Sequence, residues 1–271
     1  MANKLKVLVT GAAGRMGREV VRAISAEADM EVVAAIDPSF AAANPDTDAG
    51  VLAGVGRLGV DVQPGLSDAL YRTTPDVVVD FTQPASVMDN LRLVLGDGVN
   101  AVVGTTGLTD ADLTEIRQLC STNDARCLVA PNFAIGAVLM MQFVKAAARH
   151  MPDCEIIEMH HNKKLDAPSG TAMKTAEIVA AARTGASPDA TQKVILEGAR
   201  GGDFEGIKVH SIRMPGFVAS QEVIFGGQGQ TLTIRHDTLD RSSFMPGVVL
   251  GIRRIGGRSG LVYGLDALLE T

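Results

Sequence analysis

Short apolar runs and helically spaced apolar positions alternate along the first half of the chain. Nearly continuous apolar runs, typical of buried parallel strands, occupy residues 4–10, 30–36, 76–81, 100–104 and 126–130. Helical spacing, a proline at a first turn and a Thr-x-x-Asp pattern predict helices over residues 15–28, 84–95 and 109–122. This alternation predicts a parallel sheet covered by helices on both faces. Residues 37–59, rich in Gly, Pro, Ala and Asp, are predicted to form a long surface loop.

The second half of the chain follows a different pattern. It opens with a predicted helix, a strand and another helix, over residues 134–150, 155–161 and 171–183. Strand-like runs with little helix between them then follow, at residues 206–214, 220–225 and 230–236. They indicate a mixed or antiparallel sheet. A final helical pattern covers residues 242–255, and we expect this helix to pack back on the first domain.

Together these patterns predict an α/β protein with two domains. A Rossmann-type parallel-sheet domain would occupy residues 1–132, completed by residues 242–271. An α+β domain with a mixed sheet would occupy residues 133–241. The chain has 271 residues, of which 46% are hydrophobic, so it is long enough to bury two cores.

Charge and cysteine content narrow the class of protein. The net charge of −6 argues against a nucleic-acid-binding protein, which needs a basic surface. The start of the chain lacks a signal-peptide pattern. The uncharged stretch Cys127–Val144 contains Asn132 and Gln142, which favours a buried helix over a membrane span. The three cysteines have no C-x-x-C spacing, and they predict reduced thiols, no cysteine-based zinc site and a cytoplasmic location.

A glycine-rich turn, TGAAGRMG, follows the first predicted strand and opens the first helix. Glycines there allow a tight turn and the close approach of a pyrophosphate, which the free N–H groups of the helix start can hold. We predict that a dinucleotide contacts the turn at Gly11, Ala12, Ala13, Gly14, Arg15 and Met16. The spacing G-x-x-G-x-x-G is weak evidence alone, and an ordinary helix-start turn is the alternative.

Asp37 strengthens the dinucleotide prediction because it ends the second predicted strand, about 20 residues after the turn. A carboxylate there can accept hydrogen bonds from the adenosine ribose hydroxyls. It would repel a 2′-phosphate, and the next residue is Pro38 rather than an arginine, so the sequence favours NADH. Arg15 could offset part of that repulsion, which leaves NADPH open.

Two later strand ends complete the predicted cofactor site, because ligands of open α/β sheets lie outside the carboxyl ends of the strands. Small residues follow one strand at Gly104, Thr105 and Thr106, and they suit contact with the nicotinamide end. The other strand is followed by Ala130, Pro131, Asn132 and Phe133. Ordinary β-to-α turns are the alternative interpretation of each segment.

The stretch EMHHNKKLDAPSGTA, residues 158–172, concentrates the candidate chemistry of the second domain. Neighbouring side chains of a strand point to opposite faces, so His160 and His161 can converge only if the strand ends there. A metal site built on the two histidines, with Glu158 and Asp166 as further ligands, is not favoured because no recognisable ligand spacing completes it. We therefore expect no metal.

The same stretch ends in a predicted helix start at Ser169, Gly170 and Thr171, whose free N–H groups form an anion site. An imidazole, the ammonium groups of Lys163 and Lys164 and this helix start together suit a substrate with two carboxylates. The residues thus predict a nicotinamide-dependent reductase of a small, multiply anionic compound. Two other classes stay open, namely a dehydrogenase with a nucleophilic cysteine and a nucleotide sensor without catalysis.

The pattern E-x-H-H-x-x-K-x-D-A-P-S-G-T-A closely resembles the signature of the dihydrodipicolinate (4-hydroxy-tetrahydrodipicolinate) reductase family of bacterial lysine and diaminopimelate biosynthesis. The resemblance covers nearly the whole chain in the right order. It includes GAAGRMG at 11–17, DFT at 80–82, GTTG at 104–107, APNF at 130–133, and the tail from Arg235 through SSFMPGVVLGIR. The loop pattern is highly specific, whereas the glycine turn is not.

The resemblance implies a role for each matching residue. It makes His160 and Lys164 the catalytic residues that exchange protons while NADH or NADPH delivers hydride to the dihydrodipicolinate ring. It makes His161, Gly170 and Thr171 substrate-binding residues, and it implies a homotetramer built through sheets of the second domain. Lys163 is not a catalytic position of the family. Pro38 departs from family members that carry arginine there, which argues against a strong NADPH preference.

Overall fold

The structure is a computed structural model that describes residues 4–185 and 193–269. It divides into two compact units. The first contains the chain up to Ile135 together with the residues from Phe244 onward, and the second is Gly136–Ser243. The chain therefore passes from the first unit to the second once, and its C-terminal part returns to the first unit.

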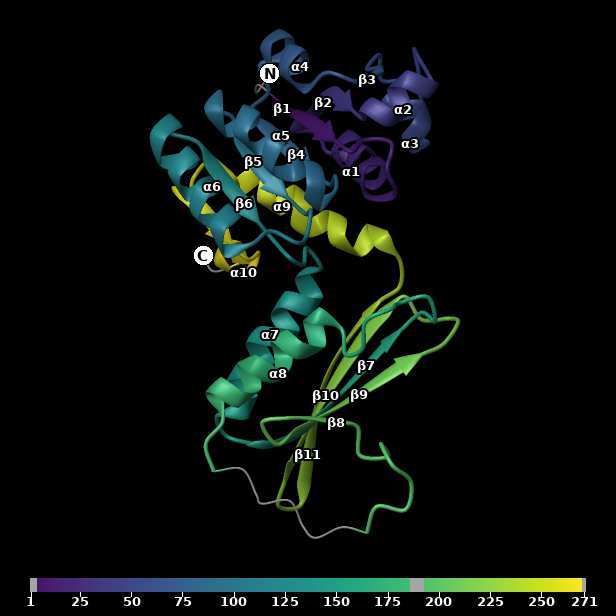
Figure 1. The fold of residues 1–271 in the computed structure, drawn as a ribbon, viewed down its shortest axis with the longest axis vertical. Coiled ribbons are helices and arrows are strands. Elements are labelled where there is room, and N and C mark those ends of the chain that lie inside the picture. Colours follow the sequence, from purple (N-terminus) through teal and green to yellow (C-terminus); the bar gives the residue numbers. More distant parts are fainter. Residues whose placement is uncertain (1–3, 186–192, 270–271) are drawn as a thin grey trace. The chain divides into compact units, whose positions relative to one another are not determined.

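The first unit is built on a parallel sheet with strand order β12-β6-β5-β4-β1-β2-β3 (Figure 1). Its strands are β1 Leu5–Thr10, β2 Met30–Ile36, β3 Val62–Gln63, β4 Val77–Asp80, β5 Asn100–Val103, β6 Arg126–Val129 and β12 Gly260–Tyr263. Its helices are α1 Arg15–Ala26, α2 Pro38–Ala43, α3 Ala49–Ala53, α4 Leu66–Thr73, α5 Pro84–Gly96, α6 Asp110–Asn123, α9 Met245–Ile255 and α10 Asp266–Leu269. The order 3-2-1-4-5-6 is that of a dinucleotide-binding sheet.

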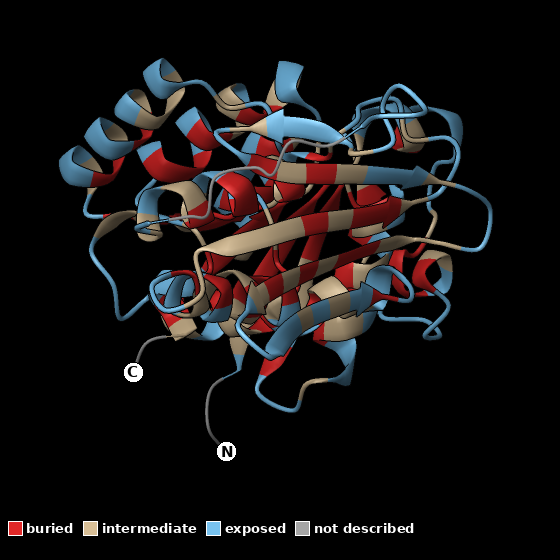
Figure 2. Cartoon of the chain, turned by 90° about the horizontal axis from the view of Figure 1, so that it is seen from below, coloured by how far each residue is buried: buried red, intermediate tan, exposed pale blue. Residues whose placement is uncertain are grey.

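Helices cover both faces of this sheet, with buried apolar residues between the layers. In Figure 2 the buried residues (red) are concentrated on strands and on parts of the helices, whereas most loops are exposed (pale blue). Apolar residues of α4, α5 and α6 form one core with the strands, among them Leu91 and Ile116. On the other face α9 packs so closely that a Cβ at Gly247 would lie 2.1 Å from the Phe133 carbonyl oxygen. Arg253 of α9 also pairs with Asp29, with an N–O distance of 2.8 Å. These contacts place the final helix in the first unit.

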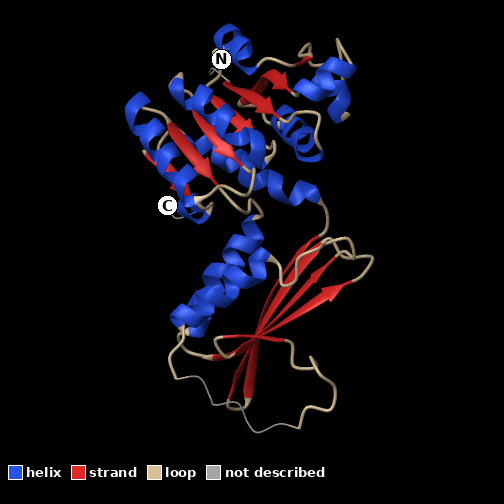
Figure 3. Ribbon diagram, viewed as in Figure 1, coloured by secondary structure: helices blue, strands red, loops and turns tan. Residues whose placement is uncertain are grey.

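The second unit has a mixed sheet with strand order β11-β10-β7-β9-β8, in which only the β7–β9 pair is parallel. Its elements are α7 Ile135–Ala148, β7 Asp153–His160, α8 Gly170–Ala182, β8 Gly202–Phe204, β9 Ile207–Arg213, β10 Ala219–Gly227, β11 Gln230–Thr238 and the 3₁₀ helix η1 Arg241–Phe244. Helices α7 and α8 lie along one face of the sheet (Figure 3), and their apolar residues share a core with Ile156 and Phe225. The predicted fold class, a Rossmann-type sheet plus a mixed-sheet unit, is confirmed.

The prediction of a long loop over residues 37–59 is wrong, because this segment contains α2 and α3. Both helices are too short to show an apolar period, and acidic residues at their starts hold them instead. Asp37 caps α2 by accepting from Phe40 N. Asp48 caps α3 and is only 5% exposed, and its carboxylate also accepts from the backbone N–H groups that close the following turn, at Leu58, Gly59 and Val60.

Replacing Asp48 by asparagine is expected to lower the free energy of unfolding by roughly 2–3 kcal/mol, because an amide NH₂ would face backbone donors. Burial acts to raise the pKa of Asp48, but the backbone hydrogen bonds from Leu58, Val51, Gly59 and Gly50 outweigh it and lower the pKa. The contribution is therefore complete above the ordinary pKa of an aspartate and is lost as pH falls through the lower folded-state value. Urea unfolding across acidic pH measures this, and Asp46→Asn, on the exposed neighbouring turn, is the matched control.

Several elements were not predicted from the sequence, namely β3, α4, β8, β12 and α10. For α4 the signal was present, since Leu66, Ala69 and Leu70 are buried at helical spacing. The strands β3, β8 and β12 are only a few residues long and need neighbouring strands to define them. Among the helices of the described residues, none is long and apolar enough to cross a membrane.

Candidate active site

The segments predicted to bind a dinucleotide follow three strands in the middle of the first unit's sheet, β1, β5 and β6, with β4 between β1 and β5. The turn at Gly11 follows β1, and the segments starting at Gly104 and Ala130 follow β5 and β6. All these strands run parallel, so the segments lie along one edge of the sheet, where ligands of such folds bind. The structure thus brings this predicted group of residues together.

The glycine turn leaves room only for backbone. Gly11 has a φ of +70°, and a Cβ on it would lie 2.6 Å from the Phe81 carbonyl oxygen. A Cβ on Gly17 would lie 2.1 Å from the Gly11 carbonyl oxygen, so the helix can start against the turn only with glycine here. Gly14 is the N-cap of α1 without a side-chain cap, which leaves N–H groups of the helix start open to an anion. The residues present therefore fit a dinucleotide pyrophosphate.

Asp37 is held at the edge of this turn. One of its carboxylate oxygens accepts from Ala13 N (3.3 Å) and the other from Phe40 N (3.2 Å). An ionised carboxylate has about four acceptor sites, so capacity for hydroxyl donors is left. The contact to Ala13 joins the predicted ribose-binding carboxylate to the predicted phosphate-binding turn.

A buried carboxylate, Asp80, links three of the strand ends. It is 1% exposed and accepts from Thr10 Oγ1 (2.7 Å), Thr105 Oγ1 (2.7 Å) and Asn90 Nδ2 (2.8 Å). Thr82 donates to it through both its backbone N–H and its hydroxyl. Thr10 ends β1, Thr82 and Thr105 follow β4 and β5, and Asn90 belongs to α5. Asp80 therefore connects the segments at the carboxyl ends of these strands, which we call the cofactor edge.

Phe81 packs across the segments that follow β5 and β6. A Cβ on Gly104 would lie 2.0 Å from a ring carbon of Phe81, so this position has to be glycine for the ring to fit. The rings of Phe81 and Phe133 lie 5.8 Å apart, centroid to centroid, at 52°. Aromatic rings therefore pack against the segment that begins at Gly104, which was not predicted from the sequence.

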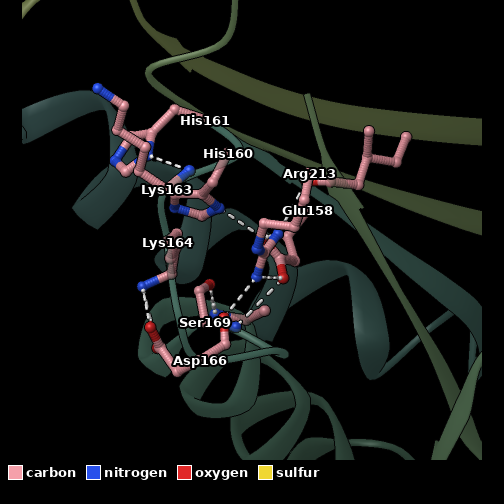
Figure 4. A network of polar contacts seen from close by, with 10 residues as sticks. Glu158, His160, His161, Lys163, Lys164, Asp166, Ser169 and Arg213 are labelled. Atoms are coloured by element: carbon pink, nitrogen blue, oxygen red, sulfur yellow. Dashed lines mark hydrogen bonds and ion pairs between the residues drawn. The ribbon is translucent and has the colours of Figure 1, made fainter. Parts of the chain in front are cut away.

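The predicted acid–base residues belong to the second unit, where β7 ends at His160, one residue before the predicted end at His161. Glu158 precedes His160 by two residues, so both side chains lie on the same face of the strand. Glu158 Oε2 lies 2.5 Å from His160 Nδ1. Arg213, at the end of the neighbouring strand β9, donates to both oxygens of Glu158, at 2.9 and 2.6 Å. Figure 4 shows this carboxylate at the centre of the network.

Glu158 is fully buried and is nevertheless the stable site of a negative charge. Burial acts to raise its pKa, but hydrogen bonds from His160, Arg213 and Ser211 outweigh burial and lower the pKa to about 2. The guanidinium of Arg213 balances the charge through a bidentate contact. Glu158 therefore stays ionised at neutral pH and accepts hydrogen bonds only.

The two lysines of the loop lie differently. Lys164 Nζ contacts both carboxylate oxygens of Asp166, at 2.8 and 2.9 Å, and its side chain is largely buried. Lys163 is exposed, and its ammonium points away from the Lys164–Asp166 pair (Figure 4). His161 is also exposed and accepts from Lys163 N through Nδ1 (3.2 Å).

The helix start at which the sequence predicted an anion site is the start of α8. Ser169 is its N-cap and accepts from Ala172 N (3.2 Å), while its own N–H donates to Glu158. The amides of Gly170 and Thr171 have no hydrogen-bond partner in the part of the chain that the structure describes. These two N–H groups can therefore bind a carboxylate at the positive end of the helix dipole.

The thiols do not suit a nucleophile. Burial raises the pKa of Cys120 and of Cys154 to about 11, and that of Cys127 well above its ordinary value. A cysteine nucleophile needs a lowered pKa, so the alternative of a thiol-dependent dehydrogenase finds no support. In the part of the chain that the structure describes, no group of three or more His, Cys, Asp or Glu side chains could hold a metal ion.

Sequence reasoning missed the groups that support the site. Asp80 and Arg213 received no role, and Glu158 was considered only as a metal ligand. A signal for Glu158 existed, since its spacing from His160 places both on one strand face. Arg213 had none, because it reaches the site only through the parallel register in which His160 is paired with Arg213.

Comparison with known proteins gives the family. The family model described as dihydrodipicolinate reductase, N-terminus, matches residues 5–133, and the one described as dihydrodipicolinate reductase, C-terminus, matches residues 136–269. The chain is 49% identical over 271 residues to 4-hydroxy-tetrahydrodipicolinate reductase of Desulfitobacterium hafniense, covering 98% of this chain and 99% of the relative. It is 47% identical over 270 residues to the protein of that name from Moorella thermoacetica, covering 100% of each.

Comparison with solved structures points to the same family. The structure resembles the dipicolinate-bound dihydrodipicolinate reductase from Paenisporosarcina sp. TG-14 with a TM-score of 0.86 and 42% identity, covering 97% of this chain and 99% of that one. An amine dehydrogenase from Mycobacterium smegmatis, 17% identical with a TM-score of 0.66 over 98% of this chain and 96% of that one, shares the fold. By family model, relatives and structure alike, the chain belongs to the dihydrodipicolinate reductase family.

Proposed function

We propose that the chain reduces 4-hydroxy-tetrahydrodipicolinate to tetrahydrodipicolinate with NADH or NADPH, in lysine and diaminopimelate biosynthesis. One observation carries the proposal. At the end of β7 a buried carboxylate holds His160, and the same carboxylate accepts from Ser169 at the start of the helix with open amides. This acid–base group beside an anion site belongs to a chain whose relatives carry the name of that reductase.

The reaction adds a hydride and a proton to the ring, and the hydroxyl group of the substrate leaves as water. A bound nicotinamide cofactor supplies the hydride, and the protein has to supply the proton. His160 and Lys164 are the proposed proton-exchanging residues. His161 and the amides of Gly170 and Thr171 are proposed to hold the carboxylates of a small dicarboxylate substrate. The ion pair of Lys164 with the exposed Asp166 contributes little stability, so a substrate carboxylate can replace Asp166.

The proposed cofactor contacts are the turn residues 11–16, Asp37, residues 104–106 and residues 130–133. The glycine turn fits a pyrophosphate, and the Asp37 carboxylate fits ribose hydroxyls. Because Asp37 is fixed by Ala13 N and Phe40 N, it cannot easily move away from a 2′-phosphate. We therefore propose that NADH is preferred over NADPH.

The proposed function is tested by mixing the protein with freshly prepared substrate and following NADH and NADPH oxidation separately. We expect oxidation of both, with the higher kcat/KM for NADH. If neither cofactor is oxidised, the proposed function is wrong. Asp37→Asn keeps an acceptor for the cap of α2 but removes the charge, so it should lower kcat/KM for NADH by about 10-fold and leave that for NADPH unchanged or higher. Unchanged selectivity in this variant would contradict the role of Asp37.

A homotetramer formed through the second unit is proposed as the assembly. In the described residues, α7 and α8 cover one face of the sheet, and apolar side chains such as Ile212 and Leu232 are exposed on its strands. Light scattering of the purified protein measures the assembly.

The free thiols of Cys120, Cys127 and Cys154 are typical of a reducing compartment, which supports the proposed cytoplasmic location.

A further inference from the structure

We propose that Glu158 is the positioning residue of the acid–base histidine. Its carboxylate keeps His160 in the tautomer with hydrogen on Nδ1, which leaves Nε2 to exchange the proton with the substrate. The inference rests on the proposed function for the role of His160, but the pairing itself is a structural claim that can be measured without turnover.

The geometry determines which nitrogen carries the hydrogen. Glu158 is ionised and can only accept, so His160 Nδ1, 2.5 Å from Oε2, has to donate. A neutral imidazole with hydrogen on Nδ1 has its lone pair on Nε2. When Nε2 takes up a proton, the carboxylate also stabilises the imidazolium that results. This is the division of roles between the aspartate and histidine of a serine-protease triad.

Apart from the hydroxyl of Ser211, which also hydrogen-bonds this carboxylate, the other groups around it are fixed donors. Oε1 accepts from Arg213 Nη2 (2.6 Å) and Ser169 N (3.2 Å), and Oε2 accepts from Arg213 Nη1 (2.9 Å). A guanidinium and a backbone amide cannot turn into acceptors. If Oε2 were replaced by an NH₂ group, His160 could adapt by accepting through Nδ1, whereas Arg213, which also donates to Oε2, could not. Hydrogen would then reside on Nε2 of a neutral ring, which leaves no lone pair there to take up the proton that His160 passes to the substrate.

The same carboxylate aligns the acid–base group with the proposed anion site. Ser169, whose N–H it holds, is the residue immediately before Gly170 and Thr171. Arg213 Nη2 also donates to the backbone oxygen of Asp166 (2.8 Å), the residue that Lys164 contacts. Glu158 and Arg213 thus connect the strand end, the lysine loop and the helix start.

A second glutamate on the same strand shows that residue types alone do not make such a site. Glu155 pairs with His210 (2.8 Å to Nε2) and with Arg200, a set of the same three residue types. Its side chain is 35% exposed, however, whereas that of Glu158 is fully buried. An exposed carboxylate can exchange its partners for water, so only Glu158 fixes the state of its histidine firmly.

The test combines kinetics with ¹⁵N NMR of the histidine ring nitrogens. We expect Glu158→Gln to move hydrogen from Nδ1 to Nε2 of His160 and to lower kcat by about 10²–10⁴-fold, the range for a general acid–base group. The KM values for substrate and NADH should change much less. Glu158→Asp keeps an acceptor-only group, so it should keep the Nδ1–H tautomer and retain more turnover than the glutamine variant.

A double variant tests the same proposal in a protein that is expected to fold. Exchanging a buried ion pair for apolar groups of similar size is often neutral for stability, so Glu158→Leu combined with Arg213→Met should fold. It should lose the preference for hydrogen on Nδ1 and lose turnover to a similar extent as Glu158→Gln. Thr175→Val removes the buried hydrogen bond between Thr175 and Gln221 (2.7 Å) in the same unit and is the control, with normal tautomer and turnover. The signals of His210 serve as an internal reference in each spectrum.

Hydrogen on Nδ1 in both Glu158→Gln and the double variant, or kcat within about twofold of wild type in either, would overturn the proposal. If wild-type protein oxidises neither NADH nor NADPH, the proposed function fails. The NMR measurement still decides whether Glu158 sets the tautomer of His160, so the two failures can be told apart.

Discussion

Replacing His160 or Lys164 by alanine is expected to lower kcat by about 10²–10⁴-fold, because each removes a group proposed to exchange a proton with the substrate. The variants should fold. Without His160, Glu158 still accepts from Arg213 and Ser169, so no buried charge is left unpaired. Without Lys164, only an ion pair to the exposed Asp166 is lost. Steady-state kinetics and a fluorescence titration with NADH measure turnover and cofactor binding separately.

Lys163→Ala provides the matched control, since it removes the neighbouring ammonium group from the same loop. Lys163 is exposed and points away from the Lys164–Asp166 pair, so we expect turnover within about twofold of wild type. A loss of turnover in Lys163→Ala as large as that in Lys164→Ala would contradict the assigned roles. Near-normal kcat in both His160→Ala and Lys164→Ala would do so as well.

The second large effect is expected at Asp80, which lies at the cofactor edge of the first unit. Asp80→Ala should lower the free energy of unfolding by about 3–5 kcal/mol, because it leaves the buried hydroxyls of Thr10 and Thr105 and the amide of Asn90 without this acceptor. It should also weaken NADH binding by at least about 10-fold, since Thr105 belongs to the proposed cofactor contacts. Urea unfolding and NADH titration measure the two effects.

Asp80→Asn tests whether the shape or the negative charge of this side chain is needed. It keeps the shape and one acceptor, and the Thr10 hydroxyl and the Asn90 amide can reverse their hydrogen bonds, so it should be less destabilising than Asp80→Ala. Asp97→Ala removes an exposed carboxylate of the same unit and should leave unfolding and NADH binding unchanged. Wild-type NADH affinity in a folded Asp80→Ala protein would show that the carboxylate does not organise the cofactor edge.

Most of the longer helices and strands were predicted correctly, because each of them forms for reasons that lie in a few neighbouring residues. The capping box at Thr109 and Asp112 starts α6, and Pro84 lies at the start of α5, as expected. The apolar runs of β1, β4, β5 and β6 are buried on both faces and therefore need no alternation to be recognised. Residues 37–59 were misinterpreted because Asp48 organises them through groups that follow it by as many as 12 residues, which no helical period reveals.

The sequence by itself determined the family, the α/β class and the residues of the two candidate sites. The reason is that glycine turns, helix caps and the loop of residues 158–172 each depend on a few consecutive side chains. The tertiary structure alone decided which groups hold those residues. Arg213 meets Glu158 through the pairing of β7 with β9, and Asp80 meets Thr10 and Thr105 through the order of parallel strands. Such partners lie tens of residues apart, and only the strand register brings them within hydrogen-bonding distance.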